Sequence, residues 1–282
     1  MYPNKKLFQL IVLFYGVLCY AQTDKKDILQ GDFTYLLKAR LNTQTPDYIH
    51  QEFFSLQIGD KRAFFASSQS IKRDSTFEKS LIREDNKDGS ISLSLKKGVS
   101  MPKTKFSYTI IQSNENTQYF ELAGMAKLTY KEPVISNWKL MNETKVINTI
   151  PCKKAEVSFK GRNWTAWYST EIPFPYGPYK FSGLPGLIVK ITDEKGDYDF
   201  ELVKSVSNSE LKGRSVNISE RRYSEAIETT QPKLQQALKN AAANTAAILA
   251  SQGTTVIGGQ EIMREREKQR EENRKYENPI EL

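Results

Sequence analysis

Residues 177–188 read GPYKFSGLPGLI, and they lead directly into the strand-like run LIVKITD. The stretch contains three glycines and two prolines, namely Gly177, Gly183, Gly186, Pro178 and Pro185. Glycine and proline set special backbone angles, and an ordinary surface loop would otherwise be polar. Here the other side chains are mostly apolar or aromatic. We therefore expect a rigid loop that is buried, either as a structural centre or as a contact surface.

A longer segment around this loop carries a family resemblance. Residues 151–193, PCKKAEVSFKGRNWTAWYSTEIPFPYGPYKFSGLPGLIVKITD, resemble the core of the GLPGLI family of Bacteroidetes-type secreted proteins. The family is named for the motif at residues 183–188, which recurs weakly as NPIEL at residues 278–282. The resemblance implies export from a Gram-negative cell and a tendency to be encoded near outer-membrane TonB-dependent receptors. It supplies no catalytic residues.

The first 21 residues have the pattern of a secretory signal peptide. Lys5 and Lys6 precede a mostly apolar run at residues 7–20, and Cys19-Tyr20-Ala21 forms a small-x-small cleavage site. The run is shorter than the roughly 20 residues that a spanning helix needs. We expect cleavage after about Ala21 and a periplasmic or secreted protein with no later transmembrane segment.

Composition excludes several kinds of site. The formal net charge is +8, and removal of two lysines with the signal peptide leaves 8 − 2 = +6. This modest excess is spread along the chain and is explained most simply by solubility. If it does serve a contact, envelope lipid is more plausible than nucleic acid. After cleavage Cys152 is the only cysteine and His50 the only histidine. We therefore expect a buried Cys152, no metal site, no cofactor and no Ser-His-Asp or Cys-His centre.

The rest of the chain up to residue 216 favours an antiparallel sheet. Short apolar runs with period-two alternation are separated by turn signals such as Gly59-Asp60, which is typical of a hairpin. The expected strands are residues 32–41, 52–58, 61–67, 105–112, 118–122, 125–130, 138–141, 145–148, 154–159, 163–169, 187–192 and 198–206. Residues 76–83 have some helical character. The predicted class is mainly β (α+β), with a curved or half-barrel antiparallel sheet in residues 22–216.

Aromatic residues gather before and within the central loop. Trp164 and Trp167 fall on opposite faces of one expected strand, so one side chain can enter the core while the other lines a groove. The plainer alternative is that both belong to the core. If a groove exists, it would hold an apolar or lipid-like ligand. The candidate groove residues are Trp164, Trp167, Tyr168, Phe181, Leu184, Leu187 and Ile188.

Residues 217–282 change in character and predict a helical, charged C-terminal region. Residues 219–251 lack glycine and are rich in Ala, Leu, Gln and Lys, with Ser224 or Thr230 as possible caps and Pro232 near a first turn. Residues 263–276, MREREKQREENRKY, place Arg266, Arg270 and Arg274 on one helix face. This face is either solvated or an electrostatic contact for a membrane surface or partner.

No catalytic motif is present in the sequence. Walker A, GxSxG, HExxH, CxxC and GxGxxG patterns are all missing. We therefore expect a non-enzymatic envelope protein that binds an apolar or lipid-like ligand. The alternative is an accessory or assembly partner of an outer-membrane TonB-dependent receptor. A carboxylate-based hydrolase has no positive support.

Overall fold

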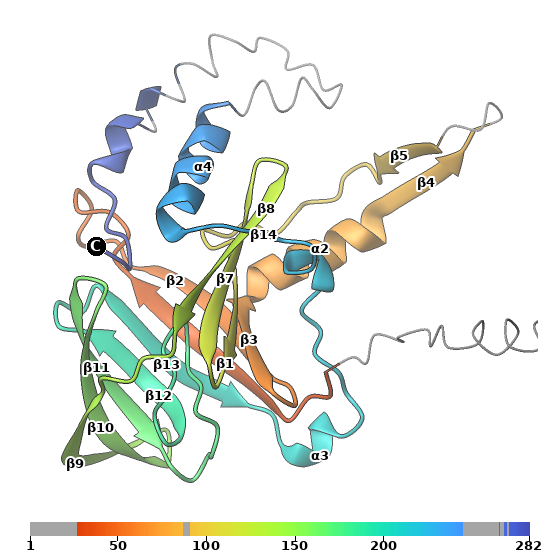
Figure 1. The fold of residues 1–282 in the computed structure, drawn as a ribbon. Helices are drawn as coiled ribbons and strands as arrows, with labels where there is room; N and C mark the ends of the chain where they lie inside the picture. The colour runs from red at the N-terminus through yellow and green to blue at the C-terminus, as the bar shows by residue number, and fades with distance from the viewer. Residues whose placement is uncertain (1–26, 87–90, 245–264, 266–267, 270) are drawn as a thin grey trace, which may run out of the picture.

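The structure, a computed structural model, describes residues 27–86, 91–244, 265, 268–269 and 271–282. The expected signal peptide at residues 1–21 lies outside these ranges. Strands make up 45% and helices 17% of the chain, and the largest sheet is antiparallel and not closed. This confirms the mainly β class with a curved, open sheet (Figure 1).

One sheet of twelve strands forms the body, in the order β14-β8-β7-β6-β3-β2-β1-β13-β12-β11-β10-β9. Neighbouring strands are antiparallel except for β14 and β8, which are parallel. Its members are β1 (Gly31–Ala39), β2 (His50–Ile58), β3 (Arg62–Ser67), β6 (Thr109–Ser113), β7 (Asn116–Ala123), β8 (Ala126–Pro133), β9 (Lys139–Ile147), β10 (Ile150–Phe159), β11 (Arg162–Ser169), β12 (Leu187–Asp193), β13 (Tyr198–Ser205) and β14 (Ile227–Glu228).

Most of the predicted strands are present, with differences at their ends. β2 and β3 pair as a hairpin across Gly59-Asp60, as the turn signal predicts. The two strands predicted at residues 138–141 and 145–148 are one continuous strand, β9, because no glycine or proline interrupts it. The strand predicted from residue 105 begins only at Thr109.

The larger hydrophobic core lies on one face of the curved sheet and is rich in aromatic rings, and a smaller cluster around Phe64, Ile111 and Phe120 lies on the other face. Phe54 and Phe65 stack with their centroids 4.9 Å apart, and Phe200 meets Phe54 edge-on at 6.0 Å. All three side chains are fully buried. Burying one such side chain contributes about 1.5–3 kcal/mol, so this cluster is a main source of the stability that holds the sheet in its curve.

Several helical segments accompany the sheet in the described part of the chain, and residues 271–274 near the C-terminus are helical as well. The segments that accompany the sheet are α2 (Ser68–Ser80), α3 (Asn208–Leu211), a short 3-10 helix (Glu220–Arg222) and α4 (Gln231–Ala243). The helix predicted around residues 76–83 is α2, which begins earlier, where the Ser67 side chain accepts a hydrogen bond from the Ser70 amide. α2 continues into the two-stranded hairpin of β4 (Leu81–Asp85) and β5 (Ile91–Leu95), and together they project from the body as an arm (Figure 1).

The described residues of the C-terminal region are helical in part, at α4 and at residues 271–274. Residues 219–230 are not an α-helix, since α4 begins after Thr230 with Pro232 in its first turn, where a missing amide hydrogen costs nothing. Leu234 of α4 is fully buried, and the helix packs on β7 and β8. Of the arginine face predicted at residues 263–276, Arg266 and Arg270 lie outside the described residues. No helix in the described part is both long and apolar enough to cross a bilayer.

Candidate functional site

The glycines of the central loop are required by close backbone approaches. Gly183 has φ +91°, and a Cβ there would lie 2.6 Å from the Ile135 carbonyl oxygen. At Gly186 a Cβ would lie 2.0 Å from the Ser169 carbonyl oxygen, which no side chain can tolerate. A Cβ at Gly177 would lie 2.7 Å from Ile188. The loop therefore packs as tightly as a core element, as its composition predicts.

The structure places the predicted groove residues mainly in this core. Trp164, Tyr168, Phe181, Leu184, Leu187 and Ile188 are all buried, at no more than 3% exposure. The rings of Trp164 and Phe181 lie 4.6 Å apart, and the Trp164 indole donates to the Phe159 carbonyl at 3.2 Å. These side chains pack against one another instead of around an open groove. An apolar ligand would have to displace them.

Trp167 is the exception among these seven residues. It is half-buried and points to the opposite face of β11 from Trp164, as the spacing predicts. We call this face, which is turned away from the core, the outer face. Trp167 is therefore the one member of the predicted set that a ligand can reach without rearrangement of the core.

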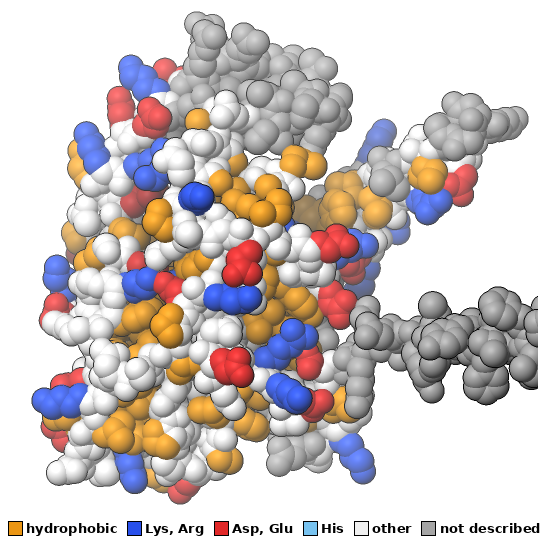
Figure 2. All heavy atoms as spheres, in the orientation of Figure 1, with side chains coloured by type: hydrophobic (Ala, Val, Ile, Leu, Met, Phe, Trp, Pro, Cys, Tyr) orange, Lys and Arg blue, Asp and Glu red, His pale blue; other side chains and the backbone are white. Residues whose placement is uncertain are grey.

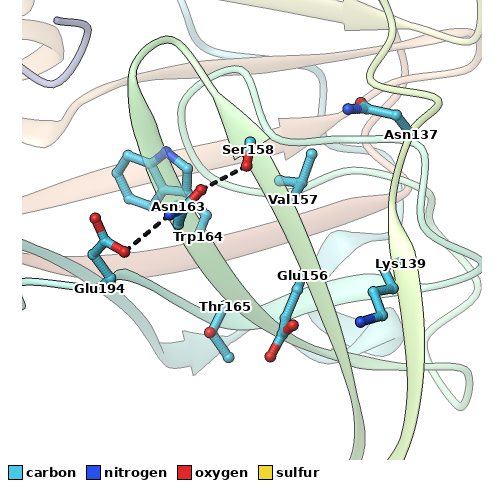
Figure 3. A pocket seen from close by; sticks show the side chains of 9 residues that line it. All are labelled: Asn137, Lys139, Glu156, Val157, Ser158, Asn163, Trp164, Thr165 and Glu194. Atoms are coloured by element: carbon cyan, nitrogen blue, oxygen red, sulfur yellow. Dashed lines mark hydrogen bonds between the residues drawn. The ribbon is translucent and has the colours of Figure 1, made fainter.

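A hollow of about 540 Å³ opens on the outer face near one end of β9, β10 and β11 (Figure 3). This volume falls within the range of small-molecule sites. Val157 and Trp164, whose side chains are buried, also line it. Its polar lining consists of Asn137, Lys139, Glu156, Ser158, Asn163, Thr165 and Glu194.

A chain of hydrogen bonds fixes one side of the hollow. The Ser158 hydroxyl donates to Asn163 Oδ1 at 2.5 Å, and Asn163 Nδ2 donates to Glu194 Oε2 at 2.9 Å (Figure 3). Ser158 and Asn163 face each other across β10 and β11, and the Glu194 amide donates to the Asn163 carbonyl at 2.9 Å. Asn163 is thus held between two elements, and its side chain is oriented before any ligand arrives.

Glu156 lies in the middle of the other side of the hollow. It faces Thr165 on β11 and Lys139 on β9 in the strand register. Hydrogen bonding from Lys154, whose Nζ lies 2.9 Å from Glu156 Oε1, holds the pKa of Glu156 below its usual value. Glu156 is therefore a charged acceptor at neutral pH. That is the opposite of a general acid, which needs a raised pKa.

Three polar groups of the hollow remain unengaged. The side chains of Asn137, Lys139 and Thr165 make no hydrogen bond or ion pair with another residue in the described part of the chain. An amide, an ammonium and a hydroxyl are therefore available to solvent or a ligand beside a fixed polar floor. That combination is typical of a binding site.

A second polar cluster lies in the interior and involves the C-terminus. Lys180, 2% exposed, donates from Nζ to the Tyr130 hydroxyl and to Glu132 Oε2, both at 2.8 Å, and also contacts Glu281. Burial opposes the charge on Glu132, but hydrogen bonds from Lys160 and Lys180 outweigh it and lower its pKa. The sequence does not predict this cluster, because Lys180 is a single lysine in the central loop and belongs to no recognisable motif.

The C-terminal segment NPIEL is held by the body of the protein. Arg162, ion-paired with Asp193 at 2.6 Å, donates to the Pro279 carbonyl at 2.8 Å. The Leu282 amide donates to the Lys160 carbonyl at 3.0 Å. The weak recurrence of the loop motif at residues 278–282 is the only feature of the sequence that connects the C-terminal segment with the central loop.

His50 and Cys152 both lie in surroundings that suit a structural role. His50, the first residue of β2, lies 3.1 Å from the buried carboxylate of Glu52, which also accepts from Ser67 and Thr104. Cys152 is buried as predicted, and burial raises the pKa of its thiol to about 11. No cluster of metal-binding side chains occurs among the described residues.

Comparisons with known proteins identify a family segment and a fold. Residues 156–190 match a family described as a protein of unknown function (Porph_ging). No curated protein matches the chain. A solved structure of PNGF-II in space group P21 is similar with TM-score 0.50 and 13% identity over 75% of this chain, and one in space group C2 has TM-score 0.45 at the same identity and coverage. The chain spans 33% of the length of either. At 13% identity, the similarity to the first structure concerns the fold alone.

Proposed function

We propose that this chain is an exported, non-catalytic binding protein of the cell envelope, a member of the GLPGLI family, and that the outer-face hollow is its ligand site. The leader pattern and the motif at residues 183–188 support export and membership. Part of the hollow belongs to the segment that matches the family of unknown function, since Glu156, Ser158, Asn163 and Thr165 fall in residues 156–190, whereas Asn137, Lys139 and Glu194 lie outside it.

The observation that carries the proposal is the pairing of a fixed polar floor with unused polar groups. The Ser158–Asn163–Glu194 chain is oriented by the strands, while Lys139 and Thr165 make no side-chain hydrogen bond in the described part and Lys139 interacts with Glu156 only electrostatically. Preorganised groups bind with a smaller entropy cost, because they need not be ordered by the ligand. The lowered pKa of Glu156 favours a binding role over acid catalysis.

Native mass spectrometry of protein purified gently from its own envelope tests this function. The mature protein should carry a mass excess that is absent from Asn163→Leu, which keeps the side-chain size but removes the bridge to Ser158 and Glu194. Asn240→Leu, on the exposed side of α4, is the matched control and should retain the ligand. Equal adducts in both variants, or a bare mass in all, would overturn the proposal.

A lipid-like ligand in the core, as the sequence suggests, makes a different prediction in the same experiment. Its mass excess would be released by organic solvent and lost in Trp164→Ala, since Trp164 is 2% exposed and packs on Phe181. Retention of the ligand by folded Trp164→Ala together with loss in Asn163→Leu separates the hollow from the core.

The second candidate function is contact with a partner, for which the family resemblance suggests a TonB-dependent receptor. The observation that favours it is the arm formed by α2, β4 and β5, which projects from the body and carries exposed apolar side chains (Figure 2). Phe77 is 42% and Leu95 44% exposed, beside a hollow of about 340 Å³. Such side chains on a projection are typical of contact surfaces.

Co-purification with the receptor tests this candidate. Phe77→Ser with Leu95→Ser should abolish it, whereas the arm variant Arg83→Ser should not. The arm is a cleaner target than deletion of residues 261–282, because that deletion also removes Glu281 and Asn278 from buried partners. Unchanged co-purification of the double variant would exclude the arm as the contact.

A further inference from the structure

We propose that the hollow and Trp167 together bind a neutral saccharide of two or more units, an inference that rests on the proposed function of the hollow. Trp167 is not part of the hollow itself. It lies two residues beyond Thr165 on β11, on the same face, at a distance of about 7 Å along the strand. The site would therefore have a polar subsite in the hollow and an aromatic subsite at Trp167, arranged one after the other along β11.

The lining of the hollow matches hydroxyl groups better than other ligand chemistries. A sugar hydroxyl both donates and accepts, so it can pair with the acceptors Glu156 and Glu194 and with the amide of Asn163 at once. An apolar ligand would remove these carboxylates from water and offer no hydrogen bond to the carboxylate oxygens that Lys154 and Asn163 leave free, which is costly. An anionic ligand would be repelled by the carboxylates of Glu156 and Glu194 and attracted by one ammonium in the lining, that of Lys139.

The indole of Trp167 has hydrogen-bonding capacity that the other tryptophans lack. Trp138 Nε1 donates to the Ser182 carbonyl at 2.9 Å, and Trp164 Nε1 donates to the Phe159 carbonyl at 3.2 Å. Trp167 Nε1 has no such acceptor among the described residues. A half-buried indole usually pairs its N–H, so this one is suited to donate to a ligand hydroxyl or to water.

The two lysines that flank Trp167 on the neighbouring strands are paired with carboxylates. The cross-strand neighbours of Trp167 are Lys154 on β10 and Lys190 on β12. Lys154 Nζ is bound to Glu143 Oε2 at 2.8 Å, and Lys190 Nζ to Asp199 Oδ2 at 3.1 Å. Both ammonium groups are thus held by carboxylates of neighbouring strands.

One cation does contact the ring: Lys145 Nζ lies 5.8 Å from the Trp167 centroid. The N–H edge of the indole has no acceptor in the part of the chain that the structure describes. A pyranose ring has an apolar C–H face and a rim of hydroxyls, so it can lie against a rigid aromatic surface while its rim is hydrogen-bonded. Because Trp has few rotatable bonds, such contact costs little conformational entropy. A sugar unit in the hollow and a second at Trp167 would use both kinds of contact.

Titration calorimetry with three neutral trisaccharides, namely maltotriose, cellotriose and triacetylchitotriose, tests the inference on the mature protein. Trialanine and citrate serve as non-saccharide probes. At least one trisaccharide should bind, and neither non-saccharide probe should. Trp167→Ala should weaken binding about tenfold or more, and Trp167→Phe, which keeps an aromatic face, should retain most of the affinity. Phe53 is an exposed aromatic residue of β2 on the same face of the sheet as Trp167. Phe53→Ala is therefore the matched control and should bind as the parent does.

The outcomes distinguish this inference from the function on which it rests. If no trisaccharide binds, but native mass spectrometry finds a non-saccharide ligand that Asn163→Leu loses, the saccharide class is overturned and the hollow remains a binding site. If neither experiment finds a ligand in the hollow, the proposed function itself fails. Equal affinities of Trp167→Ala and Phe53→Ala would remove Trp167 from the site.

Discussion

Replacing Lys180 by Met removes a buried charge while keeping the length and apolar stem of the side chain. Lys180 Nζ is bound to the Glu132 carboxylate and the Tyr130 hydroxyl at 2.8 Å, and to Glu281. The charged side chains of Lys180, Glu132 and Glu281 are each at most 16% exposed. Lys180→Met therefore leaves two carboxylates in the interior with one fewer cation.

The size of the effect follows from this arrangement. Breaking a buried ion pair costs about 3–5 kcal/mol, because the remaining charge is uncompensated. Glu132 keeps its contact with Lys160, so we expect the lower end, about 3 kcal/mol. Lys180→Met with Glu281→Leu removes both charges and should recover about 2 kcal/mol of the loss, within the range of couplings between contacting residues.

Urea unfolding followed by tryptophan fluorescence measures these free energies, with a common slope for all variants as the check that the unfolded state is unchanged. Lys131→Met, which breaks a half-exposed pair with Glu228, is the control and should change stability little. A coupling below about 0.5 kcal/mol between Lys180→Met and Glu281→Leu would refute the reasoning. The C-terminal segment would then be held by its other contacts.

Three further results are expected. Gly186→Ala should destabilise the protein by more than about 3 kcal/mol, because its Cβ would meet the Ser169 carbonyl at 2.0 Å; a cost below about 1 kcal/mol in urea unfolding would contradict this. The folded pKa of Glu132 is lowered, so its stabilising effect is present above the unfolded pKa of about 4.3 and is lost as pH falls through the folded pKa. The stability difference between the parent and Glu132→Gln should therefore shrink below about pH 4.3, and a constant difference would exclude this account. Cys152 should react with a thiol reagent only on unfolding, because it is buried with a pKa of about 11; labelling of the native protein at the rate of the unfolded chain would show otherwise.

Local patterns in the sequence predicted much of the sheet. The alternation in β1 places Phe33, Tyr35 and Leu37 in the core, and the glycines at 183 and 186 sit where the backbone leaves no room for a Cβ. These features depend on the residue itself and its near neighbours. Period two and the absence of a Cβ are visible without knowledge of the rest of the fold.

The sites depend on contacts between distant segments, which no local pattern reports. Lys180 meets Glu281 across 101 residues, and Asn163 meets Glu194 across 31. The sequence placed the aromatic residues near the central loop correctly but could not separate core from surface. Only the register of β10, β11 and β12 shows that Trp164 packs inward while Trp167 lies beside the hollow.

The most direct test of the hollow is a ¹H–¹⁵N correlation spectrum of protein without residues 1–21, recorded while a small-molecule extract of the cells that produce it is added. The three indole N–H signals report separately on the core and the outer face, since Trp138 and Trp164 are bonded to carbonyls inside the protein. We predict shifts of the Asn163 side-chain amide and the Trp167 indole, with Trp138 and Trp164 unchanged. Shifts confined to Trp138 and Trp164 would place the ligand in the core and contradict a binding site in the outer-face hollow.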